Sequence, residues 1–402
     1  MAENTTNKPA LEALESFLLN EDLDTWESMT LQVVFCNPLG GYSFREAVVT
    51  TQEMLSTFSG FPTQVSKTLP LKTCWDIEKL QNLARFQRRR SEGGVKSTND
   101  RQKSGLDREN AAFELLDNYL KEFDAHRLSL TKILKRLSVS AEGTDATDPR
   151  CGREGRVTSL TEVLNIHLFS RLSFEDSLIN DRISSSGMYG AGCGVDIQRG
   201  NTLLGSDITW HGHIDMMING TIPLKILEDE ENTSRFQETA EQGQTGTNYG
   251  GSDIDEIRYK KRIYKNQLIA ETITNAFAQT NVNTDLLGLP IPAFGCLLDK
   301  IYVYSYDCRS DILLKKMNVL KIDEENLTPV TIVKIWLYIH FSLFMRSDLT
   351  DLDQHQDLRD YTANFLSCNE NITRFYSKLE PGAPIYPKTS HERTLKLVGL
   401  KS

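Results

Sequence analysis

The chain has 402 residues, which is long enough to bury a full core and to form two or three domains. Its hydrophobic content of 39% and charged content of 25% are ordinary for a globular protein. The formal net charge of −10 and the pI of about 5.4 exclude a polycation built to coat nucleic acid, although a local basic face stays open.

Cysteine spacing and hydropathy further narrow the class of protein and its compartment. Seven cysteines with no C-x-x-C pair predict neither a disulfide framework nor a zinc knuckle. The first residues contain no basic region followed by an apolar one, so we expect no signal peptide. The longest apolar run, 331–345, contains Lys334 and His340 and is too short and too polar to span a bilayer. We therefore expect a protein of the cytoplasm or nucleus with no membrane segment.

Residues 1–140 are predicted to form a mixed, mainly helical N-terminal region. Apolar spacing of three and four residues indicates helices, and the β-branched run LQVVFC indicates a strand. The expected elements are a helix within 11–30, a strand at 31–36, helices at 43–58 and 74–87, and a long helix at 107–139.

A basic segment, 85–136, overlaps that region. It holds thirteen Lys and Arg against eight Asp and Glu, and its first part, 85–108, has the polar composition of an exposed linker. One interpretation is a patch that contacts nucleic-acid phosphates. The alternative, which we favour, is a charged linker followed by a solvated helix.

A breaker-rich linker at 141–156 separates this region from a second one, 157–346. The second region is expected to contain a disordered acidic insertion at 228–257, and a helix and loose tail at 347–402 follow it. Its expected elements are a helix at 157–180, a hairpin within 207–228, a helix at 258–280, strands at 292–298, 300–307 and 311–322, and a helix at 328–346. This order predicts an α/β (α+β) fold with a mixed sheet between helices.

The hairpin carries the chemistry that stands out. Asn219-Gly220 lies between two apolar runs, one with Asp215 and the other with Lys225. Period-two geometry places His211, His213, Asp215 and Met217 on one face of the first strand, and Pro223, Lys225 and Leu227 on one face of the second. A buried Asp and a buried Lys are tolerable only when they are paired or bind a metal, so the two form either a structural ion pair or part of an active site.

This order of elements and residues resembles the PD-(D/E)XK nuclease-like superfamily, whose fold is that of restriction endonucleases. The resemblance rests on Asp215 in WHGHIDMMI, Lys225 in TIPLKIL, Glu162 in SLTEVLNIH and Gln267 in KNQLIAETI, and it covers roughly 157–345. It implies phosphodiester hydrolysis of DNA or RNA.

The resemblance also implies a role for each matched residue. Asp215, with Glu162 as an outer ligand, would hold Mg²⁺, for which Mn²⁺ can substitute. Lys225 would stabilise charge in the transition state, and Gln267 would position the site or a phosphate.

One position departs from the pattern. The acid of acid-x-Lys falls on Pro223, which has no side-chain ligand and no ladder N–H, so we expect an edge strand or a bulge there. Glu228 or Glu230 are candidates to replace it. Two functions therefore stay open: a metal-dependent nuclease, and an inactive pseudo-nuclease that serves as a nucleic-acid or protein interaction module.

Several of these residues also have purely structural explanations. Glu162 lies three residues after Ser159, which fits a helix capping box. Gln267 and Glu271 fit the exposed side of an amphipathic helix. His211-Gly-His213 has the spacing of an amidohydrolase metal pair, but the chain contains only seven histidines.

Two other motifs suggest nucleotide or nucleic-acid contacts. The alternating Tyr302, Tyr304 and Tyr306 are candidates for base stacking, but we favour a half-buried strand face. The glycine-rich stretch within 183–201 lacks the lysine pattern of a phosphate-binding loop, so we expect a flexible loop.

Overall fold

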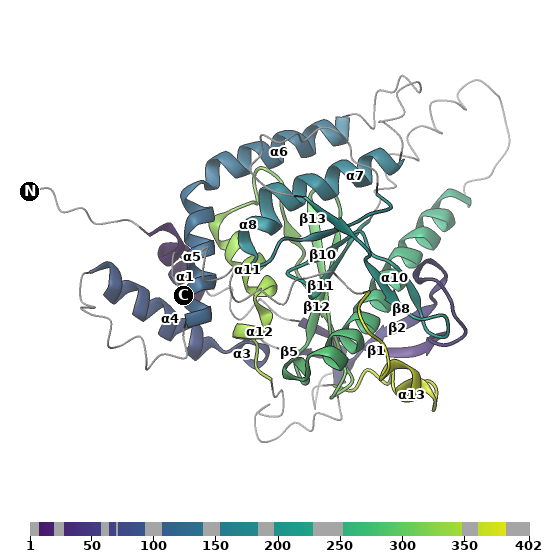
Figure 1. Cartoon of the computed structure of the whole chain (residues 1–402). Coiled ribbons are helices and arrows are strands. Elements are labelled where there is room, and N and C mark those ends of the chain that lie inside the picture. The colour runs from purple at the N-terminus through teal and green to yellow at the C-terminus, as the bar shows by residue number, and fades with distance from the viewer. Residues whose placement is uncertain are drawn as a thin grey trace, which may run out of the picture.

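The computed structural model is organised around one eleven-stranded mixed sheet with helices on both sides (Figure 1). The structure describes residues 8–19, 28–57, 64–69, 71–92, 107–139, 153–183, 197–227, 252–347 and 361–382. The main path of the sheet runs β2-β1-β14-β13-β12-β11-β10-β6-β7, with β15 beside β13 and β5 beside β1.

The N-terminal part alternates helices and short strands. Its elements are α1 (Pro9–Leu19), β1 (Ser28–Cys36), η1 (Phe44–Glu46), β2 (Val49–Glu53), β3 (Leu55–Thr57), β4 (Gln64–Ser66), β5 (Thr68–Leu69), α3 (Leu71–Cys74), α4 (Ile77–Ser91), α5 (Asp107–Lys121) and α6 (Phe123–Val139).

The middle of the chain contributes a helix, the hairpin and several short strands. These elements are α7 (Arg153–Leu164), the π-helical turn η4 (Asn165–Phe169), α8 (Ser170–Leu172), β6 (Leu178–Asn180), β7 (Gln198–Gly200), β8 (Leu203–Gly205), β9 (His211–His213), β10 (Met216–Ile218) and β11 (Ile222–Ile226).

A long helix and the remaining strands complete the sheet. The elements are α10 (Ser252–Val282), η5 (Thr284–Leu286), β12 (Ile291–Cys296), β13 (Lys300–Asp307), β14 (Ile312–Lys316), β15 (Leu320–Lys321), α11 (Pro329–Ile339), α12 (Phe341–Phe344) and α13 (Ile372–Tyr376).

The centre of the sheet follows chain order. β6, β10 and β11 form antiparallel pairs, and β11 then pairs in parallel with β12. A parallel pair needs a crossover connection, which α10 supplies. β12, β13 and β14 continue as antiparallel neighbours. The mixed sheet between helices that the sequence predicts is therefore present.

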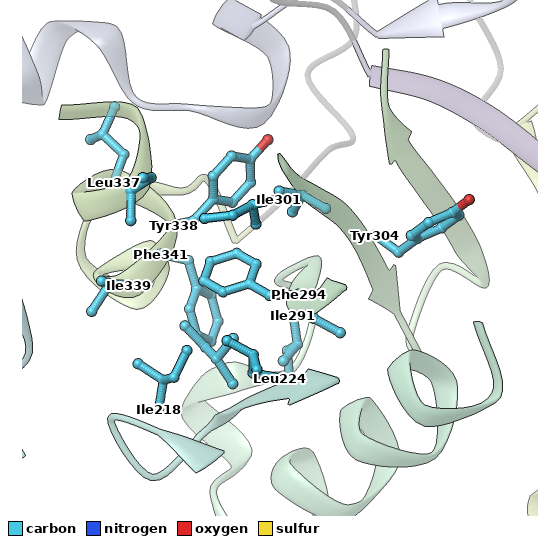
Figure 2. Close-up of a cluster of buried hydrophobic side chains, with 14 of the residues drawn as sticks. Ile218, Leu224, Ile291, Phe294, Ile301, Tyr304, Leu337, Tyr338, Ile339 and Phe341 are labelled. Carbon is cyan, nitrogen blue, oxygen red and sulfur yellow. The ribbon is translucent and has the colours of Figure 1, made fainter. Parts of the chain in front are cut away.

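The two faces of the sheet can be told apart on β12. Phe294 stacks on Phe169 of η4 at 5.8 Å between ring centroids and meets Tyr338 of α11 edge-on at 6.2 Å. Figure 2 shows Phe294 in the apolar cluster with Leu224, Tyr338 and Phe341. The next residue, Gly295, points the opposite way, because a Cβ there would lie 2.5 Å from Leu268 of α10. Thus α10 covers one face, and η4 and α11 cover the other.

The expectation of a mainly helical N-terminal region is wrong. The strand expected at 31–36 is confirmed as β1, but 43–58 forms η1, β2 and β3 instead of a helix. The β-branched run at 48–51 favours a strand, and most of it forms β2, which pairs with β1. β1 in turn pairs with β14, so N-terminal strands extend the same sheet as the hairpin.

Several expected boundaries also shift. The long helix at 107–139 is two helices that meet at Glu122, and α4 continues to Ser91, inside the expected linker 85–108. The helix expected at 157–180 ends at Leu172, and β6 follows it. The strand expected at 311–322 is split into β14 and β15.

Other expectations fall on positions outside the described residues. They are most of the linkers at 93–106 and 140–152, the glycine-rich stretch 184–196, the acidic stretch 228–251, and the tail at 348–360 and 383–402. Within the expected insertion, α10 already begins at Ser252. In the described part of the chain, no helix combines the length and the apolar character that crossing a membrane requires.

Candidate functional site

The hairpin forms as its turn sequence predicts. Asn219 and Gly220 have positive φ angles of 49° and 68°, and the N–H of Thr221 donates to the carbonyl of Ile218 at 3.1 Å. Positive φ at both central turn residues is what a tight two-residue hairpin turn requires, and Asn-Gly supplies it with little strain. The turn sets the register of β10 on β11.

Asp215 lies at the bend immediately before β10, where both of its carboxylate oxygens are bonded. Lys225 Nζ donates to Asp215 Oδ1 at 3.0 Å, and the N–H of Ile226 donates to Oδ2 at 2.7 Å. The backbone carbonyl of Asp215 also accepts from the N–H of Asn180 at the end of β6. The side chains of Asp215 and Lys225 are 9% and 19% exposed, so this is a mostly buried ion pair.

Helix α10 brings two more polar groups to the same place. Lys225 shares its register with Gly295, so its side chain lies on the face of the sheet that α10 covers. Gly295 lets α10 approach closely, since any Cβ there would collide with Leu268. Gln267, one residue before Leu268, donates through Nε2 to Glu271 Oε1 at 2.9 Å.

Glu271 is the most unusual member of this cluster. It is fully buried, and its Oε2 atom has no hydrogen-bond partner. Burial raises the pKa of Glu271 to about 7, while Lys225 and the hydrogen bond from Gln267 lower it and Asp215 raises it. Glu271 is therefore partly protonated near neutral pH, beside an ion pair that is already balanced. We call Asp215, Lys225, Gln267 and Glu271 the buried polar cluster.

Glu162 does not act as a helix cap. Ser159 lies inside α7, which begins at Arg153, so the expected capping box is absent. Instead, Glu162 is 2% exposed and accepts from Arg199 Nη2 on β7 at 2.7 Å. This contact ties α7 to the far end of the sheet.

These residues do not fit the Mg²⁺ site that the resemblance implies. Mg²⁺ takes octahedral oxygen ligands and is usually held by one or two carboxylates that can face it. Here Asp215 is bonded to Lys225 and Glu162 to Arg199, so each expected ligand is neutralised by a cation of the chain. Over the described residues, no three His, Cys, Asp or Glu side chains gather closely enough to hold a metal ion.

The histidines of the hairpin belong to a different sheet. His211 and His213 lie on β9, which pairs with β8 as a separate two-stranded sheet. The chain bends at Ile214 and Asp215, so the single strand expected to carry His211, His213 and Asp215 on one face is broken. Burial, followed by the charge of Arg182, lowers the pKa of His213.

Pro223 lies in the interior of the sheet, so the expected edge or bulge is wrong. Its strand, β11, pairs with β10 on one side and β12 on the other, and Pro223 itself is in register with Met217. The ladder with β12 begins at the next residue, Leu224. The two proposed replacement acids, Glu228 and Glu230, lie outside the described residues.

Part of the basic segment is held in ion pairs where it is described. Its helices α4, α5 and α6 carry ion pairs between cations of the segment and acids of α1, α5, α6 and the residues after β15. These pairs are Arg88–Glu15, Arg90–Glu114, Lys121–Asp117, Arg127–Asp124 and Lys135–Glu324. Such pairing weakens the attraction of this surface for a polyanion.

The tyrosines of β13 are mostly core residues. Tyr304 and Tyr306 are buried, and Tyr306 donates its hydroxyl to Asp311 Oδ1 at 2.7 Å. Tyr302 is partly buried against the core. Tyr304 and Tyr306 are therefore not available to stack on bases, as the interpretation of a packed strand face predicts.

Comparisons with known proteins assign no family to this chain: no protein-family model, no curated protein and no solved structure matches it.

Proposed function

We propose that this chain is a pseudo-nuclease: a protein with a nuclease-like core that acts by binding and not by hydrolysis. The order α7, β6, β10, β11, α10, β12 supports a nuclease-like core, because it presents Lys225 on β11 and Gln267 on α10, with Asp215 at the bend immediately before β10. The absence of catalysis is proposed because both carboxylate oxygens of Asp215 already accept hydrogen bonds, one from Lys225 and one from the N–H of Ile226.

A cleavage assay tests this proposal. Purified protein and its Asp215→Asn variant are incubated with single- and double-stranded DNA and RNA, with Mg²⁺, Mn²⁺ or EDTA. We expect no metal-dependent cleavage by either protein. Cleavage by the wild type that disappears in EDTA and in Asp215→Asn would overturn the proposal.

A metal-dependent nuclease remains the second candidate because of Glu271. Its unpartnered Oε2 and its position beside Asp215 and Lys225 offer a carboxylate from α10 where Pro223 offers none. In that case Glu271→Gln would abolish cleavage as completely as Asp215→Asn. The same assay, with Glu114→Gln as a control on an acid of α5 outside the cluster, separates the two candidates.

For the pseudo-nuclease we propose a protein partner in preference to nucleic acid. Several cations of the basic segment are already held in ion pairs, and the whole chain is acidic. Exposed apolar side chains at the end of the sheet, Val34 and Phe35 on β1 and Val48 before β2, are a surface that suits a protein.

Fluorescence anisotropy with labelled DNA and RNA at 50 mM and 200 mM salt tests the partner class. We expect no saturable binding at micromolar protein. Binding that tightens at least tenfold at the lower salt concentration would show phosphate contacts and restore the nucleic-acid alternative.

A further inference from the structure

Helix α4 ends in three consecutive arginines followed by a serine, in the sequence RRRS. Ser91 is the last residue of the helix and is only partly buried, whereas Arg88, Arg89 and Arg90 are exposed. Beyond Glu92 the chain lies outside the described residues until Asp107. A serine hydroxyl with arginines one, two and three residues before it therefore lies at the surface, at the end of a helix.

Few bonds hold the last turn of this helix. Ser91 Oγ donates to the carbonyl of Arg88 at 2.7 Å, and the N–H of Glu92 donates to the same carbonyl at 3.1 Å. The last carbonyls of a helix have no partner further along it, so the final turn opens more easily than the interior. An enzyme can therefore draw Ser91 into an extended conformation while Leu80 and Leu83 of α4 stay buried in the core.

Two of the three arginines tie α4 to neighbouring helices. Arg88 Nη2 lies 2.7 Å from Glu15 Oε1 of α1, and Arg90 Nη1 lies 2.8 Å from Glu114 Oε1 of α5. The arginine side chains of these pairs are 58% and 50% exposed, so each pair is open to water and to a competing anion. Arg89 forms no ion pair within the part of the chain that the structure describes, so its charge is available to a partner.

We propose that Ser91 is phosphorylated by a protein kinase that recognises arginines before the acceptor serine, and that the phosphate takes Arg88 from Glu15. Such a site does not depend on the proposed function. The Ser91 hydroxyl oxygen attacks the γ-phosphorus of ATP, the bond from that phosphorus to the bridging oxygen breaks, and ADP leaves. The hydroxyl proton passes to the catalytic aspartate of the kinase. Positive charge close to the acceptor suits a kinase whose substrate groove is acidic.

Helix geometry brings the phosphate to Arg88 in preference to Arg90. Residues three apart are neighbours on a helix surface, and helical side chains lean toward the N-terminus, so Ser91 Oγ lies over the turn that carries Arg88. Adjacent residues point to different sides of a helix, which leaves Arg90 with Glu114. A phosphate carries about two negative charges on several acceptor oxygens, so it binds a guanidinium group more strongly than the single carboxylate of Glu15 does.

The exchange of partners weakens the hold of α4 on α1. Leu14 and Phe17 of α1 stay buried in the core, so α1 remains docked but opens more often once Glu15 has lost its partner. The phosphate also lies at the negative end of the α4 dipole and beside Glu92, which destabilises the last helical turn. Phosphorylation therefore loosens α1 and leaves the contact between α4 and α5 in place.

Phosphorylation of the full chain in vitro tests the site. The protein is incubated with cyclic-AMP-dependent protein kinase and Mg-ATP, and its tryptic peptides are sequenced by tandem mass spectrometry. Residues 86–96 contain Ser91 as their only hydroxyl side chain, so a phosphate on this stretch is assigned without ambiguity. Ser104 and Ser138, which also follow basic residues, lie in other tryptic peptides. We expect a phosphate on 86–96 in the wild type and none there in Ser91→Ala.

A matched pair of arginine variants tests the recognition. Arg89→Ala removes a charge two residues before Ser91 without breaking an ion pair of the described chain, and it should slow phosphorylation of Ser91 about tenfold. Arg85→Ala removes an exposed charge of the same helix six residues before Ser91, and it should change the rate by less than about twofold. Phosphate only at other serines, or equal rates in the two variants, would overturn the proposal.

Hydrogen exchange measures the effect of the phosphate on α1. Phosphorylation of the wild type should speed exchange of the α1 amides about threefold, as the loss of one exposed ion pair predicts, and should leave α5 unchanged. Glu15→Gln removes the same ion pair beforehand, so its α1 exchange should already be faster and should respond little to the phosphate. Unchanged α1 exchange in the fully phosphorylated wild type would contradict the exchange of partners at Arg88.

Discussion

The two faces of the central sheet bury different kinds of side chain, although successive residues of one strand point to opposite faces. On β11, Leu224 belongs to the apolar cluster with Phe294 (Figure 2), whereas the next residue, Lys225, joins the buried polar cluster under α10. The apolar face contributes burial with no directional requirement. The α10 face also buries apolar side chains such as Leu268 and Phe277, but its polar groups must each find a partner, so they specify position more than they add stability.

Helix α10 shows how the polar face sets position. Asn275 Nδ2 donates to the carbonyl of Thr221 at 2.9 Å, and Gln279 Nε2 donates to that of Gly220 at 3.2 Å. These bonds give partners to backbone carbonyls of the partly buried hairpin turn. The helix therefore fixes the hairpin, and with it the placement of Asp215 and Lys225.

The largest effect is expected on the apolar face. Phe294→Ala removes a fully buried ring that packs on Phe169 and Tyr338, and it should lower the free energy of unfolding by about 4 kcal/mol. Urea denaturation followed by circular dichroism measures this change. A loss below about 1 kcal/mol would show that the apolar face is not the main source of stability.

Breaking the ion pair on the α10 face should lower the free energy of unfolding by somewhat less. Asp215→Ala leaves Lys225 and the N–H of Ile226 without their acceptor, and we expect a loss of about 3 kcal/mol. The double variant Asp215→Leu with Lys225→Met should recover much of it, since matched apolar side chains need no partner. A double variant less stable than Asp215→Ala would mean that the pair itself is a strong stabilising contact.

The smallest expected effect is a change of stability with pH that is caused by Glu271. Burial raises the pKa of this carboxyl from its ordinary value of 4.5 to about 7 in the folded state, so the folded protein holds the extra proton between these values. The stability that this proton confers is present below pH 4.5 and is lost as the pH rises through 7, by about 3 kcal/mol in the limit. Relaxation and water entry reduce the measured change, and we expect about 2 kcal/mol.

Glu271→Gln provides the comparison for that prediction. Glutamine cannot ionise, so the variant should lose less stability than the wild type between about pH 5 and pH 8 in parallel urea titrations. The raised pKa values of Asp307 and Asp311 act equally in both proteins and cancel in the difference. Identical pH profiles would indicate that Glu271 is ionised and bonded in the folded state.

Local signals predicted the C-terminal half of the fold well. Asn219-Gly220 marked the hairpin, and the runs at 292–298 and 300–307 became β12 and β13 almost residue for residue. The pairing of β1 with β14 lies beyond any local pattern, because its hydrogen bonds join strands from opposite ends of the sequence. The helix expected at 43–58 failed for a related reason, since strand pairing overrides a short helical periodicity.

The candidate site was predicted in part. Pairing of Asp215 with Lys225 follows from the hairpin, whereas for Glu271 the sequence pattern indicates only the exposed side of an amphipathic helix, and in the structure it is fully buried. A signal was present: from Asn266 to Asn281, Glu271 is the only charged residue, which is typical of a helix buried on all sides. Contacts such as Glu162 with Arg199 depend on side chains brought together only by the tertiary fold.

The pairing of β1 with β14 has a consequence for synthesis of the chain. Ser28 meets Lys316, so one edge of β1 stays unpaired until β14 has been synthesised, although β2 on its other side follows it directly. During that interval the open backbone edge of β1 is available to other chains. Folding of this protein is thus set by contacts that form late, and helper proteins that shield the first strand would be expected to raise its yield.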